Sequence, residues 1–195
     1  MAGYASTPLT TTTLGTALLR LSPLIISSAS LMCAWDQQNA FRSFLAPPLL
    51  RKPHDICAHV VVEWFAEFAK PTKWVIILSY PFALIIAFIN AFGAPGAGLH
   101  PQTKAFYAAG GVLSILHFYF GTWSMMWNAR ISSKEHIGPK NYEALRGWLG
   151  NNFMRMCTVN VPAWFMFVCA TATFIQGCVA GMRGGKEARK QLEAQ

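Results

Sequence analysis

The chain has 195 residues, of which 53% are apolar and only 12% are charged. A soluble domain carries roughly 25% charged residues, so the composition excludes a pair of small soluble domains. It also excludes a disordered chain, because disorder requires low hydrophobicity. A net charge of +8 would suggest a nucleic-acid partner in a soluble protein. Here we expect no nucleic acid, because the basic residues must first be placed against lipid headgroups.

Residues 1–13 contain no Lys or Arg, so they lack the basic start of a cleavable signal peptide and are expected to form a flexible lead-in. The stretches that are long and apolar enough to cross a bilayer as helices are residues 14–35, 74–92, 105–127 and 156–180. A backbone in lipid must satisfy its own hydrogen bonds. The predicted fold is therefore all-α, a four-helix transmembrane bundle over residues 14–182, followed by a basic polar tail over residues 183–195.

The first long connection contains a segment, residues 54–69, with one polar and one apolar side. This pattern predicts an amphipathic helix that lies on the membrane or caps the bundle. Asp55, His59 and Glu63 stand four residues apart on its polar side. They are a weak candidate metal site, with a solvated polar face as the alternative. The chain has no C-x-x-C pair, which disfavours a thiol oxidoreductase.

Small and polar residues follow one face of the third predicted helix, three or four residues apart. They are Gly110, Ser114, His117, Gly121, Ser124 and Asn128. Small residues allow helices to approach closely, and His117 lies near the middle of the helix. Two interpretations stay open: a packing face with one hydrogen-bonded histidine, or a histidine that lines an internal cavity and exchanges protons there.

The start of the fourth helix carries a second polar face, formed by Trp148, Asn152 and Arg155 at positions i, i+4 and i+7. Each of them alone is typical of a membrane interface. Together with Asn128 at the end of the neighbouring helix, they suggest a polar mouth in which Arg155 could bind a phenolate or a carboxylate. Asp36, at the expected end of the first helix, is either salt-bridged or faces a cavity. Pro81 and Pro162 are expected to kink their helices.

Two segments resemble motifs of the anthrone oxygenase-like integral membrane proteins. That family has a similar length, four membrane helices, and longer polar segments after helices one and three. An Asn at the end of helix three is followed three residues later by Leu or Ile, as Asn128 and Ile131 are here, with Trp127 where the family often has Pro. Helix four of the family opens with W-x-x-x-[HN]-x-x-R, which residues 148–155 match.

Members of this family lie beside polyketide pathways, and some oxidise an anthrone to an anthraquinone with O2. The resemblance implies a membrane-embedded, cofactor-independent oxygenase or related tailoring enzyme that acts on a lipophilic aromatic polyketide, with O2 as co-substrate. Its base would take a proton, a cation and amides would hold the oxyanion, and aromatic rings would stack on the polycycle. The candidate catalytic residues are His117, Arg155, Asn152 and Asn128, and the candidate substrate-binding residues are Trp123, Trp127, Trp148 and Asp36.

Two alternatives stay open. The chain could be a non-enzymatic multi-pass scaffold or transport-linked protein, or a membrane cyclase or isomerase. The expected partners are the lipid bilayer and a small hydrophobic substrate, with a homo-oligomer left open. The expected location is the endoplasmic reticulum or another internal membrane if the source is a eukaryote. The orientation of the bundle in the membrane is left open, because the basic tail and the basic loops favour opposite arrangements.

Overall fold

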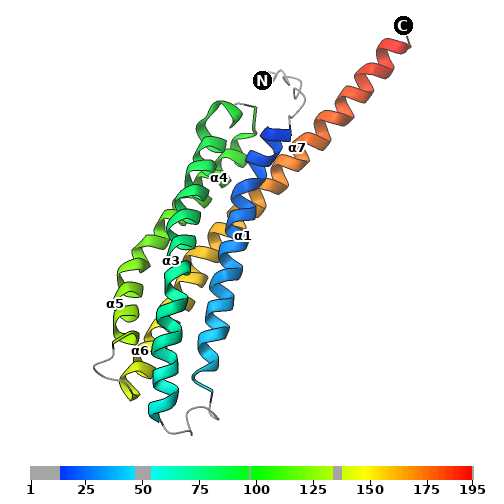
Figure 1. Cartoon of the computed structure of the whole chain (residues 1–195). Helices are drawn as coiled ribbons and strands as arrows, with labels where there is room; N and C mark the ends of the chain where they lie inside the picture. The colour runs from blue at the N-terminus through cyan, green and yellow to red at the C-terminus, as the bar shows by residue number, and fades with distance from the viewer. Residues whose placement is uncertain (1–13, 47–53, 97, 134–137, 195) are drawn as a thin grey trace.

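A computed structural model describes residues 14–46, 54–96, 98–133 and 138–194 of the chain (Figure 1). The elements are α1 (Leu14–Ser43), α3 (His54–Phe92), η1 (Ala94–Gly96), α4 (Pro101–Leu116), η2 (His117–Phe120), α5 (Gly121–Ile131), α6 (Pro139–Arg155), η3 (Met156–Asn160) and α7 (Val161–Glu193). No strand occurs in these described ranges, and the predicted all-α class is confirmed. The predicted lead-in, residues 1–13, lies outside them.

Four long helical rods make up the bundle (Figure 1). Two rods are the single helices α1 and α3. The other two are the uninterrupted series α4–η2–α5 and α6–η3–α7. All four are long and apolar enough to cross a membrane, and only 22–33% of their most apolar windows is buried inside the bundle. Most of their apolar side chains therefore face outward, among them Leu18, Ile25, Val75 and Phe82, as a lipid-facing surface requires.

The helices extend beyond the apolar stretches that predicted them. Residues 54–69 are helical, as predicted, but they continue through Pro71 into the second span and form one helix with it. Val61 and Phe65 of this segment are buried in a cluster with Phe41 of α1. The segment therefore packs against the bundle, which is the capping arrangement, and does not form a separate helix on a membrane surface.

The C-terminal region is helical as well. α7 continues to Glu193, so the predicted start of the tail at residue 183 is not a helix end. Figure 1 shows the last turns of α7 projecting beyond the other rods. Residues 181–187 are all exposed.

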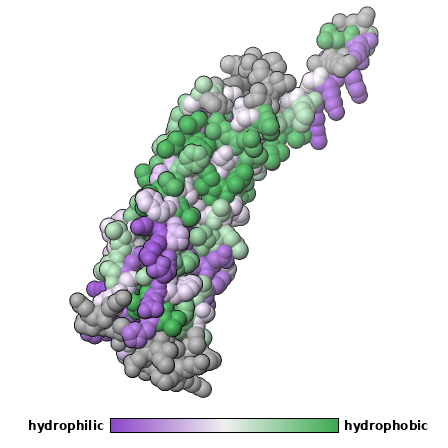
Figure 2. Space-filling view, viewed as in Figure 1, coloured by the Kyte–Doolittle hydropathy of each residue, from purple (hydrophilic) through white to green (hydrophobic). Residues whose placement is uncertain are grey.

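Two apolar clusters fill the bundle at different levels. The lower cluster joins α1, α3, α5 and α6 through Phe41, Val61, Phe65, Ile131, Tyr142, Ala144, Leu145, Trp148 and Leu149. The upper cluster joins α3, α4 and α7, together with Leu99, through Ala87, Ala91, Leu99, Tyr107, Phe167, Ala170 and Phe174. Figure 2 shows apolar residues over the middle and upper part of one face, and hydrophilic residues towards the end where α5 and α6 lie. Along α3, along α4 to α5 and along α6 to α7, the residues of the candidate site lie between the two clusters.

The two predicted proline effects differ. Pro162 follows a π turn, η3, in which the N–H of Val161 donates to the carbonyl of Met156, five residues earlier. A proline has no N–H and its ring clashes with the preceding turn, so a wider turn before Pro162 relieves the clash. Pro81 lies inside α3, which stays α-helical through it.

Candidate functional site

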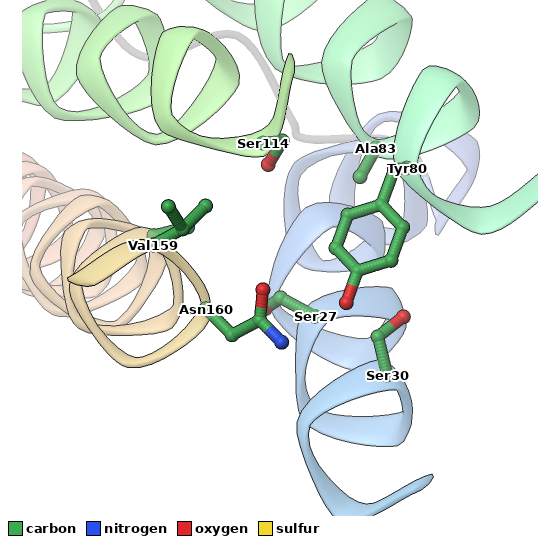
Figure 3. Close-up of a pocket in the computed structure, with 8 residues that line it drawn as sticks. Ser27, Ser30, Tyr80, Ala83, Ser114, Val159 and Asn160 are labelled. Atoms are coloured by element: carbon green, nitrogen blue, oxygen red, sulfur yellow. The ribbon is translucent and has the colours of Figure 1, made fainter. Parts of the chain in front are cut away.

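A polar layer separates the two apolar clusters and contains two adjoining pockets. The pocket that we call the Asn160 pocket is lined by Ser27, Ser30, Tyr80, Ala83, Ser114, Val159, Asn160 and Ala163 (Figure 3). The pocket that we call the Arg155 pocket is lined by Ser30, Cys33, Ala34, Gln37, Val75, Ile76, Ser79, Tyr80, His117 and Arg155. Ser30 and Tyr80 line both. Each pocket has a cavity volume of about 10 Å³, which is room for about one water molecule.

His117 lies in this layer with only 2% of its surface exposed. Its Nδ1 is 3.1 Å from Oδ1 of Asn160. An amide oxygen can only accept a hydrogen bond, so Nδ1 carries the proton and donates it. The other ring nitrogen, Nε2, is then unprotonated in the neutral imidazole and can accept a proton. Tyr80 stacks on the ring, with 3.6 Å between centroids and 26° between planes, which fixes its orientation further.

His117 and Asn160 each lie at an irregular turn. His117 is the first residue of the 3₁₀ turn η2, and Asn160 is the last residue of the π turn η3. Asn160 follows Arg155 by five residues, which would place the two roughly 140° apart around a regular α-helix. The wider π turn brings both of them into the same layer. Single π turns within α-helices occur frequently at functional sites.

Arg155 is buried, with 4% of its surface exposed. Its Nη2 donates to Oδ1 of Asn152 over 2.5 Å. Nδ2 of Asn152 in turn donates to the carbonyl of Ala34 and to Oε1 of Gln38, at 3.2 and 2.8 Å. The guanidinium is therefore held by neutral groups of α1 and α6. Its Nε–H has no hydrogen-bond partner among the described residues, although buried donors in proteins are normally paired.

Two further polar atoms of the layer have no partner within the described residues: Oγ of Ser79 and Nδ2 of Asn160. Figure 3 shows the side chains of Tyr80, Ser30 and Asn160 pointing toward one another across the Asn160 pocket. The layer thus offers a proton acceptor on His117, a cation on Arg155 and unused hydrogen-bond donors. In apolar surroundings, such a set can remove a proton from a weak acid and stabilise the anion that results.

Of the predicted catalytic residues, three occur together. His117 and Arg155 line the same pocket, and Asn152 holds Arg155 in place. The fourth, Asn128, lies on α5 and lines neither pocket. Its Oδ1 is buried without a partner among the described side chains and backbone groups.

None of the four predicted substrate-binding residues lines either pocket. Trp148 is buried in the lower cluster, with its ring centroid 5.0 Å from that of Phe41. Trp127 packs against the backbone of Gly147, where a Cβ atom would lie 2.7 Å from the indole ring. Trp123 is 49% exposed on the outside of the bundle. Asp36 is exposed as well, because α1 continues past it and turns it outward.

The predicted face of the third helix is continuous only in its first half. Gly110, Ser114 and His117 are buried, but the residues after them follow the tighter 3₁₀ turn, which changes the helix phase. A Cβ atom at Gly121 would meet nothing within 4 Å. Ser124 regains a contact, because its Oγ accepts from Nδ2 of Asn151 at 2.8 Å. Both open interpretations apply to this face, a packing seam near Gly110 and a pocket beside His117.

The alternative metal site is not assembled by the described side chains. No group of three or more His, Cys, Asp or Glu residues occurs among them. His59 and Glu63 are exposed, and the side chain of Asp55 lies outside the part of the chain that is described. The metal interpretation therefore stays a prediction from the spacing.

Sequence reasoning missed Tyr80, Asn160 and the glutamines of α1. Tyr80 directly precedes Pro81 inside an otherwise apolar span, and Asn160 comes two residues before Pro162. A polar residue near a proline in an apolar helix was the signal that could have identified both. Gln37 and Gln38 were missed because the first helix was expected to end near residue 35, whereas α1 continues to Ser43.

Similarity to curated proteins points to oxidative chemistry. The chain is 29% identical over 153 residues to a Mollisia scopiformis protein named Probable epoxidase scpX, covering 78% of this chain and 93% of that protein. It is 27% identical over 155 residues to the Oxaleimides biosynthesis cluster protein N of Penicillium oxalicum, covering 79% and 88%. It is 26% identical over 158 residues to Epoxidase gkaX of Penicillium citrinum, covering 80% and 94%.

No protein-family model matches the chain, so the anthrone oxygenase resemblance gains no confirmation from that source. No solved structure matches it either. The named relatives support an oxidative, tailoring-type role in fungal biosynthesis at a coarse level.

Proposed function

We propose that this chain is a membrane-embedded tailoring oxygenase that uses O2 to oxidise a lipophilic, electron-rich intermediate. The observation that carries the proposal is the pairing of His117, oriented by Asn160 and Tyr80, with the buried guanidinium of Arg155 on one pocket. The rods around them are long and apolar enough to hold this polar layer inside a bilayer. The similarity to proteins named epoxidases supports the oxidative part of the proposal.

The reaction that we favour begins with proton removal. Nε2 of His117 takes a proton from an acidic CH2 group of the substrate, and Arg155 stabilises the enolate oxygen. The electron-rich carbon then reacts with O2, and the CH2 group becomes a carbonyl while one molecule of water is released. Both electron pairs that reduce O2 come from the substrate, so this reaction requires no resident cofactor. An anthrone is a substrate of this kind.

Epoxidation is the second version of the oxidative proposal, and the names of the similar proteins favour it. Transfer of one oxygen atom from O2 to a carbon–carbon double bond leaves the second atom to be reduced to water. That reduction consumes two electrons and two protons, so this version requires an external reductant. Dependence on added reductant therefore separates the two versions.

The size of the Arg155 pocket limits how a substrate can bind. With room for about one water molecule, the pocket cannot enclose a polycycle. We therefore propose that only the reacting group enters, while the bulk of the substrate stays outside among apolar side chains and lipid. In this arrangement, Trp148 contributes to packing and Trp123 has no part in binding.

A non-enzymatic membrane protein is the second candidate function, and the tight seam at Gly110 favours it. A Cβ atom there would lie 2.5 Å from the ring of Phe167, as in a bundle built for close packing. A membrane isomerase or cyclase would use the same base without O2. The experiment below separates all three.

The test replaces the chromosomal copy of the gene by a His117→Ala variant in the producing organism, with Trp123→Ala as the matched control. Cultures are grown under ¹⁸O2, and lipophilic metabolites are compared by mass. We expect the His117→Ala strain to lose a product that carries one ¹⁸O atom and to accumulate its precursor, and the control to keep the product. An unchanged metabolite profile would contradict an enzymatic role, and a lost product without ¹⁸O would indicate an isomerase or cyclase.

A further inference from the structure

We infer that the Arg155 pocket binds the acidic group of an amphipathic lipophile as an anion, and that this group enters sideways from the bilayer between α1 and α3. The ligand class is an apolar molecule with a carboxylate, enolate or phenolate. The inference rests on the proposed function, because it names the substrate class of the same site.

Arg155 has no acidic partner among the side chains that the structure describes. Every Asp and Glu whose side chain the structure describes is exposed, and the ion pair found among the described residues joins Lys70 to Glu67. The hydrogen-bond partner of the guanidinium is the neutral amide of Asn152. A buried cation without an acidic partner is costly. An anionic ligand would remove that cost through charge-assisted hydrogen bonds.

The guanidinium is held ready for such a ligand. Asn152 receives one N–H of Arg155, and its own amide is fixed by the carbonyl of Ala34 and by Gln38. The Nε–H of Arg155 and the hydroxyl of Ser79 are left without partners among the described residues. Because the cation is already fixed in position, an anion binds without the entropic cost of ordering a long side chain.

The shape of the pocket selects the acidic group alone. The space available fits about one water molecule, which matches one oxygen atom of a carboxylate or an enolate. The apolar remainder of the ligand must then lie outside the pocket.

Most residues that line the pocket belong to two neighbouring helices, α1 and α3. One wall of the pocket comes from α1, through Ser30, Cys33 and Gln37, and the facing wall comes from α3, through Val75, Ile76 and Ser79. Val75 is 48% exposed on the outer surface of α3. An apolar chain that leaves the pocket at this wall therefore passes directly into the lipid-facing surface.

The depth of the pocket suits an acid dissolved in a bilayer. Lys73 and Trp74 are exposed, and the ammonium of Lys73 lies 5.6 Å from the Trp74 ring, a pair typical of the membrane interface. Ser79 follows Trp74 by five residues, or roughly 8 Å along the helix. A lipophilic acid keeps its charged group near the interface and its apolar part in the hydrocarbon, which is the position that the pocket requires.

The experiment measures binding without turnover. The full-length protein is placed in phosphatidylcholine nanodiscs and titrated with cis-parinaric acid, a fluorescent polyene carboxylate, and with its methyl ester. We expect the acid to bind about ten-fold more tightly than the ester, or better, because only the acid can pair with Arg155. Equal binding of acid and ester to the wild-type protein would overturn the inference without any variant.

Variants test whether Arg155 causes the preference for the acid over the ester. Arg155→Met is expected to abolish it, Arg155→Lys to keep part of it, and the exposed matched control Arg130→Met to leave it unchanged. If Arg155→Met keeps the preference, the inference is wrong. Phosphatidic acid is added as a competitor, because a lipid phosphate shares the same chemistry. Displacement of the probe by phosphatidic acid at equal concentration would assign the pocket to a headgroup and overturn the substrate assignment.

Failure of this inference can be told from failure of the proposed function. Loss of the ¹⁸O product in the His117→Ala strain, together with equal binding of acid and ester, would overturn only the anion site. A preference for the acid that depends on Arg155, with unchanged metabolites in that strain, would overturn only the oxygenase.

Discussion

His117 and Asn160 are hydrogen-bonded across the bundle, with 3.1 Å between Nδ1 and Oδ1. The bond connects a 3₁₀ turn in one rod to a π turn in another. Each rod thus departs from regular α-helix at the residue that it contributes to the bond. The irregular turns and the polar layer are one feature of the molecule, because a regular helix would turn at least one of the two side chains away.

Asn160 is predicted to act as a positioning residue. Asn160→Ala removes the acceptor for Nδ1 of His117, so the imidazole loses its fixed tautomer and orientation. We expect kcat to fall about ten- to a hundred-fold, a part of the value of a well-placed base, with a smaller change in KM. Asn160→Asp keeps an acceptor and should restore most of the rate. Turnover in isolated membranes with the accumulated precursor is the measurement, and equal kcat in the alanine variant would contradict the assignment.

Asn152 is predicted to stabilise the fold through Arg155. Asn152→Leu removes the acceptor of a buried guanidinium and the additional hydrogen bond that Asn152 donates to the carbonyl of Ala34. We expect the free energy of unfolding to fall by about 1–3 kcal/mol, the usual cost of an unsatisfied buried polar group. Unfolding in mixed micelles with increasing dodecyl sulfate gives the value. Asn39→Leu, on the exposed side of α1, is the control and should change stability by less than about 0.5 kcal/mol.

The two glycines of the third rod are predicted to respond in opposite ways. Gly110→Val places side-chain atoms where a Cβ atom alone would lie 2.5 Å from the Phe167 ring, and should destabilise the protein by about 1–3 kcal/mol through overpacking. Gly121→Ala meets open space and should stabilise helix α5 by about 0.5–1 kcal/mol. The same unfolding assay compares them, and an equal effect of both changes would contradict the packing seam.

We predict that Trp148 stabilises the fold by packing and that Trp123, on the outside of the bundle, does not. Trp148→Ala removes a ring that contacts Phe41 and Phe65, and should cost about 3–5 kcal/mol of stability. Trp148→Phe should recover much of that loss. Trp123→Ala should change neither stability nor turnover, because the ring is on the outside of the bundle. A loss of turnover in Trp123→Ala with unchanged stability would show that Trp123 contacts the substrate after all.

The sequence was sufficient for the fold class because lipid restricts the choices. Uncharged apolar stretches of spanning length have few stable structures other than helices. The ends of the helices were harder to predict from the sequence. α1 and α3 continue past their apolar stretches because residues such as Phe41 and Phe65 pack together beyond them, and that contact joins segments far apart in the chain.

For the site, the useful signal was that polar residues are scarce in the apolar helices. His117 and Arg155 stood out because polar residues are costly in apolar helices. Asn160 was missed because regular α-helical spacing from Arg155 points elsewhere, and the π turn that corrects the phase cannot be derived from spacing. Trp148 was placed with the substrate because an aromatic residue that stacks on a ligand and one that packs on Phe41 have the same sequence pattern.

The helical series α6–η3–α7 is longer than a bilayer is thick. It runs without interruption from Pro139 to Glu193, over 55 residues, which at about 1.5 Å per residue is roughly 80 Å. A hydrocarbon core of about 30 Å covers less than half of that length. If these helices cross a bilayer, the remainder of the series lies outside the hydrocarbon. Proteases, antibodies and soluble electron donors would then reach this part of the protein without entering the lipid.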